Sequence, residues 1–160
     1  MKKLYLGIFL FFMALSGYCQ TSGPVIFLIR HCEKAMESTD DPNLSEEGKL
    51  RARQLAEILS QTGIEKIYST PTNRTLQTAE PLTKMIRLTP TLYNPTEDAL
   101  VELLKKSTGK SLVVGHSNTL LQLLNALSGS TLYQPTEAYG ELWVITLTGD
   151  RKAIVYKLSF

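Results

Sequence analysis

The sequence predicts an α/β fold: a three-layer sandwich whose mostly parallel sheet carries helices on both faces and ends in an antiparallel hairpin. Short apolar runs rich in valine and isoleucine, such as Val25–Ile29 and Ser111–Val114, are typical of strands buried on both faces. Stretches with apolar residues at helical spacing separate these runs, and this alternation favours parallel strands. The 160 residues suffice for one domain of this kind.

The N-terminal segment has the features of a secretory signal. A pair of lysines precedes an almost wholly apolar run, Leu4–Leu15, which is too short to span a bilayer comfortably. We therefore expect residues 1–19 to be a cleaved signal peptide and residues 20–160 to form one exported domain, periplasmic or secreted, with no membrane span after cleavage. A retained N-terminal anchor is the alternative, whereas the bulky Tyr18 argues against lipidation of Cys19.

The first half of the domain is interpreted from capping residues and spacing. Ser45 is expected to cap an amphipathic helix that ends at Gly63. Lys66–Ser69 follows as a short strand. Thr70 is then predicted to be the N-cap of the next helix, with Pro71 at its first helical position.

The second half contains three more strands and two helices. Leu88–Tyr93 is predicted to be an edge strand that is broken by Pro90. Thr96 is expected to cap the helix after it, and another amphipathic helix follows the fourth strand. The last two strands, Glu141–Leu147 and Ala153–Leu158, are predicted to form the terminal hairpin.

Composition limits the classes of function. Without Lys2 and Lys3, the basic and acidic residues balance at 15 each, which argues against a nucleic-acid or membrane-surface binder. If Cys19 leaves with the signal peptide, Cys32 is the single cysteine and no intramolecular disulfide can form. We interpret Cys32 as a small half-buried side chain, with a nucleophilic thiol as the alternative.

Three strand ends carry side chains suited to an anion. Arg30 and His31 follow the first strand, Arg74 lies in the first turn after the second, and His116 follows the fourth. The carboxyl ends of parallel strands open on one edge of the sheet, and the chain's only two histidines are both here. One imidazole can attack phosphorus while arginines and the second imidazole hold its oxygens. A metal site built from the histidines and Cys32 lacks a further ligand and a recognised spacing.

These residues lie in motifs that resemble a known family. Leu28-Ile29-Arg30-His31-Cys32-Glu33 resembles the Arg-His-Gly signature of the histidine phosphatase superfamily, in its phosphoglycerate-mutase-like branch 1. Ser69–Ala79 resembles the second motif of that family, and Val113–Ser117 resembles the third. The motifs occur in family order and span nearly the whole expected domain.

The resemblance implies a phosphatase that acts through a phosphohistidine intermediate on a phosphomonoester or phosphoramidate. It implies that His31 is the nucleophile and that Arg30, Arg74 and His116 complete the phosphate pocket. Because Arg30, Arg74 and the two imidazoles can already neutralise the phosphoryl oxygens, and no oxygen-rich carboxylate cluster occurs in the sequence, we expect no metal ion and no cofactor.

The chain departs from the family pattern at two places. Cys32 replaces the glycine of the first motif, which a small side chain tolerates. Asn94 falls near the usual position of the carboxylic acid that protonates the leaving group, and an amide cannot serve as that acid. Glu97 is our choice for this role, with Asp98 and Glu33 as alternatives. The domain is therefore either a phosphatase or a catalytically impaired phosphate-binding module of the same fold.

The partner is expected to be a small-molecule or bulky phosphorylated substrate. The short connections contain no lid-sized insertion, so we predict an open, shallow site. An envelope sugar phosphate, or the varied substrates of a scavenging phosphatase, fits an exported protein better than a cytosolic glycolytic intermediate does.

Overall fold

The fold was analysed in a computed structural model, which describes residues 23–94, 99–131, 133–134, 138–149 and 152–160. The expected signal peptide lies outside the described residues. So do Thr96, Glu97 and Asp98, so the structure gives no position for the predicted helix cap or for the acid that we selected.

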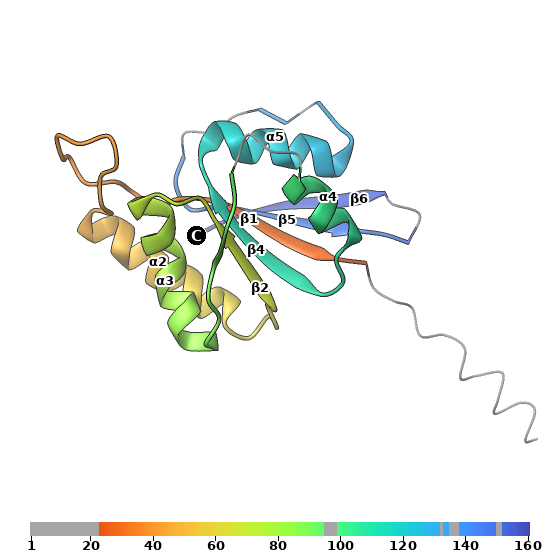
Figure 1. Ribbon diagram of the computed structural model, residues 1–160, viewed down its shortest axis with the longest axis horizontal. Coiled ribbons are helices and arrows are strands. Elements are labelled where there is room, and N and C mark those ends of the chain that lie inside the picture. The colour runs from red at the N-terminus through yellow and green to blue at the C-terminus, as the bar shows by residue number, and fades with distance from the viewer. Residues whose placement is uncertain (1–22, 95–98, 132, 135–137, 150–151) are drawn as a thin grey trace, which may run out of the picture.

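One six-stranded sheet organises the domain, in the order β3-β2-β4-β1-β5-β6 (Figure 1). The strands are β1 (Val25–Arg30), β2 (Lys66–Ser69), β3 (Thr91–Leu92), β4 (Lys110–Gly115), β5 (Glu141–Leu147) and β6 (Ala153–Ser159). The first four run parallel, while β5 is antiparallel to both β1 and β6. The predicted mostly parallel sheet with a terminal antiparallel hairpin is confirmed.

Helices cover both faces of the sheet, as predicted. They are α2 (Glu46–Leu59), α3 (Asn73–Ile86), α4 (Ala99–Lys106) and α5 (Ser117–Ser128). Figure 1 shows α2 and α3 on one side of the sheet and α4 and α5 on the other. The central strand β1 alternates between the two layers: Phe27 and Ile29 pack with α2 and α3, and Ile26 and Leu28 pack with α4 and α5.

The register brings the predicted strand ends together. Arg30 at the end of β1 pairs with Gly115 at the end of β4, and Ser69 at the end of β2 pairs with Val114. The residues that follow these strands therefore meet at one edge of the sheet.

The start of α3 differs from the prediction. The N-cap is Thr72, not Thr70, and Pro71 lies outside the helix. The residue before a proline is pushed toward extended backbone, so the chain makes a turn after β2 before the helix begins. The carboxylate of the distant Asp41 accepts the backbone N–H of Asn73 at 3.0 Å and so caps the helix from another loop.

Two other boundaries shift, and His116 is the N-cap of α5. α2 ends at Leu59, and Gly63 lies beyond it in a turn with φ of 77°. β3 is shorter than the expected strand because Pro90 has no N–H for the ladder. Within the described part of the chain, no helix is long and apolar enough to cross a bilayer.

Candidate active site

His31 lies directly beyond the central strand and is 5% exposed. Its Nδ1 lies 2.7 Å from the carbonyl oxygen of Cys32. A carbonyl can only accept, so Nδ1 carries the proton and donates it. The other ring nitrogen, Nε2, therefore keeps its lone pair in the neutral ring, as a nucleophile requires.

The surroundings of His31 favour its neutral form. Burial lowers the pKa of His31 from 6.5 to about 4, and the charges of Arg30 and Arg74 and the nearby His116 act in the same direction. The hydrogen bond to Cys32 opposes this change without cancelling it. At neutral pH His31 is thus a neutral imidazole, with a proton on Nδ1 only, beside two arginines.

His116 joins the site from the end of β4. Its ring centroid lies 5.4 Å from that of His31, in an edge-to-face arrangement. Its Nε2 lies 3.1 Å from the hydroxyl oxygen of Thr70, which in turn lies 3.0 Å from the hydroxyl oxygen of Thr75. Burial is the largest of the effects that lower the pKa of His116, followed by the charges of Arg74 and Arg30. Buried hydroxyls therefore orient the second imidazole.

Arg30 is held against an aromatic ring. Its guanidinium carbon lies 4.5 Å from the ring centroid of Tyr139, a cation–π distance. The same ring lies 6.0 Å from that of His31. Tyr139 thus forms one wall of the site. Sequence reasoning missed it because a lone tyrosine before a strand gives no signal of its long-range position.

Arg74 is held by the loop between β1 and α2. Its Nη1 lies 3.2 Å from Oδ1 of Asp41, and Arg74 is the less exposed partner of this ion pair. The charge of Asp41 also raises the pKa of His116, opposite in sign to the effects of Arg74 and Arg30. No local pattern in the sequence marks the contact between Asp41 and Arg74, which lie 33 residues apart.

The side chains of Cys32 and Glu33, the two residues after His31, contact residues outside the proposed phosphate pocket. Cys32 is 1% exposed and packs with Leu44 and Ala52, and burial raises the pKa of its thiol to about 12. This thiol is therefore no thiolate nucleophile at neutral pH, as interpreted from the sequence, although the side chain is fully buried and not half-buried as predicted. Glu33 forms an ion pair with Arg51 at 2.6 Å, which occupies one of its carboxylate oxygens.

The expected acid position does not carry an acid in the described chain. Asn94 is exposed just beyond β3. The neighbouring Tyr93 reaches inward, its hydroxyl 3.4 Å from the carbonyl oxygen of Val114, and burial raises its pKa to about 12. A side chain at Gly115 would collide with this hydroxyl, which explains the glycine before His116. Among the described residues, no cluster of three or more histidine, cysteine, aspartate or glutamate side chains could hold a metal ion.

Comparison with known families agrees with the motifs. Residues 26–95 match the model of the histidine phosphatase superfamily (branch 1). This stretch contains Arg30, His31 and Arg74 and ends before His116. No significantly similar sequence was found among curated proteins.

Solved structures share the architecture. The protein histidine phosphatase SixA complexed with tungstate is 22% identical, the match covering 84% of this chain and 96% of that one with a TM-score of 0.69. A putative phosphohistidine phosphatase SixA from Agrobacterium tumefaciens is 18% identical over 85% and 97% of the two chains, with a TM-score of 0.66. A mycobacterial glucosyl-3-phosphoglycerate phosphatase in complex with VO3 is 15% identical over 85% and 98%, with a TM-score of 0.65. At these identities the likeness establishes the fold. Over residues 26–95 the chain is thus similar in sequence to the histidine phosphatase superfamily, branch 1, and it shares its fold with these solved structures.

Proposed function

We propose that this protein is a metal-independent phosphatase that hydrolyses a phosphomonoester or phosphoramidate through a phosphohistidine at His31. Arg30, Arg74 and His116 bind the phosphoryl oxygens. The observation that carries the proposal is the state of His31: Nδ1 donates to a carbonyl at 2.7 Å, and burial keeps the ring neutral. Nε2 is therefore a nucleophile without the help of a separate base.

The reaction has two steps. In the first, the Nε2 lone pair attacks phosphorus, and the bond to the leaving oxygen or nitrogen breaks with its electron pair on the leaving atom. In the second, water attacks phosphorus, the P–N bond breaks, and the electron pair returns to Nε2 while the proton of the attacking water passes to solvent. Two guanidinium groups and an imidazole N–H offset the charge that develops on the oxygens, so the chemistry requires no metal ion.

The leaving group decides how much an acid contributes. Aryl phosphates and phosphoramidates release leaving groups more readily than alkyl phosphates do, and they suit a site with Asn94 near the usual acid position. Glu97 is our choice for the acid where one is needed. Glu97→Gln should then reduce turnover of an alkyl phosphate by roughly 10²–10⁴ and that of para-nitrophenyl phosphate much less. Equal losses on both substrates would remove Glu97 from this role.

A phosphate-binding module without turnover is the second candidate, and the amide at Asn94 favours it. Hydrolysis of para-nitrophenyl phosphate by the purified protein separates the two. If the protein is a phosphatase, its turnover should survive EDTA, be inhibited by vanadate and be almost abolished in His31→Ala. Removing one hydrogen-bond donor of the pocket, in Arg74→Ala or His116→Ala, should lower turnover by a factor on the order of 10²–10³.

The outcomes of this assay are distinct. Vanadate binding without product release would establish the binding module instead. Activity that EDTA removed and Mg²⁺ or Zn²⁺ restored would contradict the metal-independent mechanism. Arg87→Ala is a matched control for Arg74→Ala, because Arg87 ends α3 at the opposite end of the helix and should leave turnover unchanged.

A further inference from the structure

The last strand of the sheet carries a row of exposed apolar side chains. β6 ends the strand order, so among the described residues no further strand pairs with its outer edge. Ile154, Tyr156 and Leu158, here called the apolar row, are 44%, 62% and 51% exposed. They alternate along the strand and therefore project from one face of it. A hydrophobic edge strand of this kind is a template for pairing with another chain.

The register of the β5–β6 hairpin determines which backbone groups of β6 face outward. Just beyond the two strands, the backbone N–H of Phe160 donates to the carbonyl oxygen of Gly140 at 3.0 Å. Hydrogen-bonded pairs alternate along an antiparallel ladder, so the residues of the apolar row bond to β5 through their backbone. The backbone N–H and C=O groups that point to the outer edge belong to the other four residues, Ala153, Val155, Lys157 and Ser159.

One two-fold register pairs all four of these outward-facing residues with a second copy of β6. The axis passes through Tyr156. Ala153 then lies opposite Ser159 of the second copy, in a hydrogen-bonded pair. Val155 lies opposite Lys157 in the same way. A shift by one pair in either direction leaves a terminal residue without a partner and brings Val155 or Lys157 opposite its own copy.

The same register matches the side chains of the apolar row. Ile154 lies opposite Leu158 of the second copy, and Tyr156 lies opposite its own counterpart. These are the pairs without mutual backbone hydrogen bonds, in which side chains approach most closely. A two-fold interface must be complementary to itself. The apolar row meets this condition, and it therefore favours a second copy of this chain over an unrelated partner.

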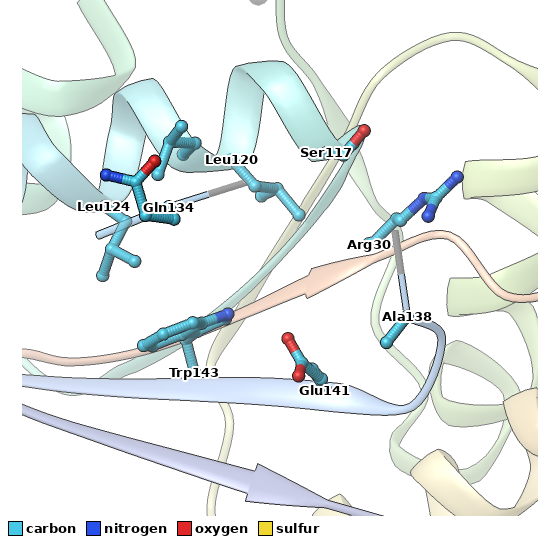
Figure 2. A pocket seen from close by; sticks show the side chains of 9 residues that line it. Arg30, Ser117, Leu120, Leu124, Gln134, Ala138, Glu141 and Trp143 are labelled. Atoms are coloured by element: carbon cyan, nitrogen blue, oxygen red, sulfur yellow. The ribbon is translucent and has the colours of Figure 1, made fainter. Parts of the chain in front are cut away.

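Lys157 carries the charge that could prevent such pairing, and the fold directs it away from the edge. Lysines on edge strands commonly block association. Here Nζ of Lys157 lies 2.9 Å from Oε1 of Glu141 and 5.4 Å from the centre of the Trp143 ring. Figure 2 shows Glu141 and Trp143 on the face of β5 that is turned toward α5. The ammonium group is thus neutralised on the inner side of β6, and its neighbour across the interface is the uncharged Val155.

Pairing through β6 closes at two copies. The two-fold axis uses β6 of both copies, so only the other edge of each sheet is left. That edge is β3, which has two residues and follows Pro90, a residue without an N–H to donate. One seven-residue strand from each copy forms an interface below the standard size of about 800 Å2 per partner. We therefore expect a dissociation constant in the micromolar range.

We infer that this protein forms a two-fold dimer through antiparallel pairing of β6 with β6 of a second copy, which joins the two six-stranded sheets into one. The interface is separate from the proposed catalytic chemistry, because it contains none of the residues of the phosphate site. Its formation is therefore testable whether or not the protein is a phosphatase.

Sedimentation velocity at rising protein concentration measures the self-association. The chain from Gln20 on, the exported form expected from the sequence, contains every described strand and helix. It should dimerise reversibly. Tyr156→Lys places two like charges opposite each other on the axis and should weaken the dimer at least about tenfold. The matched control is Leu92→Lys, at a 56% exposed position of the other edge strand, which should leave the dimer unchanged. Circular dichroism checks that both variants are folded.

Disulfide trapping tests the register. The two copies of Tyr156 should have Cα atoms about 4.5 Å apart, a separation that a disulfide spans. Tyr156→Cys should therefore give a cross-linked dimer on mild oxidation. Ile154→Cys, on the same face of β6, is the matched control and should not, because its two copies lie about 14 Å apart along the paired strands. The native Cys32 is 1% exposed and too buried to react.

Each contrary result overturns a defined part of the inference. A monomer at every concentration would refute the dimer. A dimer that Leu92→Lys disrupts and Tyr156→Lys does not would place the interface at β3 instead. Cross-linking of Ile154→Cys in preference to Tyr156→Cys would refute the register. A monomer whose Val155 and Lys157 amides are protected from hydrogen exchange would show that a segment of the same chain covers this edge, and would refute the dimer as well.

Discussion

The neutral His31 makes a quantitative prediction about folding. Its pKa in the folded protein is about 4, against 6.5 in an exposed imidazole. Between these two values the unfolded chain takes up a proton that the folded chain does not. The free energy of unfolding should therefore fall as the pH falls from 6.5 to 4, and this contribution is absent above 6.5.

The size of the effect follows from the same difference. At about 1.36 kcal/mol per pKa unit, the difference between the two pKa values of His31 corresponds to about 3 kcal/mol in the free energy of unfolding. Solvent that reaches part of the ring reduces this figure, so we expect about 1–3 kcal/mol. The perturbation is His31→Asn, whose amide N–H can replace the Nδ1 donor to the carbonyl of Cys32 without a titrating group.

The assay is urea unfolding of both proteins from pH 7.5 to 4 in buffers without phosphate. The wild type should lose about 1–3 kcal/mol more than His31→Asn across this range, since other titrating groups contribute to both. The stability difference between the two should be constant above pH 6.5. Parallel curves down to pH 4, or an NMR titration of His31 near 6.5, would refute the claim that the ring is held neutral.

Substitutions at two residues probe the site further, and one mass measurement tests the N-terminus. Thr70→Val removes the hydroxyl beside His116 and should lower kcat/KM about fivefold, as one neutral hydrogen bond predicts, while Thr70→Ser should retain activity; equal losses in both variants would contradict an orienting role. Asp41→Asn keeps an acceptor for the cap of α3 but removes the charge that pairs with Arg74. The inhibition constant of phosphate should then fall up to about fivefold, and a rise would mean that the ion pair orients Arg74 for binding. Intact-mass measurement of protein from its native envelope should show loss of residues 1–19, and a full-length mass would contradict a cleaved signal peptide.

Much of the fold could be predicted because local patterns and tertiary structure agree. The continuous apolar run of β1, buried on both faces, and the helical spacing of α2 and α5 predicted both the sheet and its two covered faces. The start of α3 differed from the prediction because a distant residue decides it. Thr70 has the chemistry of an N-cap, but its hydroxyl contacts His116, and Asp41 caps α3 in its place.

The site could be predicted only in part for the same reason. Arg30, His31 and His116 follow strands whose parallel order fixes where their ends meet. Tyr139 reaches the site through the folding of the chain before β5, and no local pattern in the sequence marks it. Contacts between segments far apart in sequence are set by packing, and a single sequence does not record that packing.

The covalent step at His31 is the central claim, and the location of the trapped phosphoryl group tests it most directly. Enzyme mixed with para-nitrophenyl phosphate is quenched rapidly in alkali, digested and mapped by mass spectrometry. We predict an acid-labile phosphoryl group on the peptide that contains His31, present in His116→Ala and absent from His31→Ala. A phosphoryl group on the peptide that contains His116, still formed in His31→Ala, would show that the roles of the two histidines are reversed.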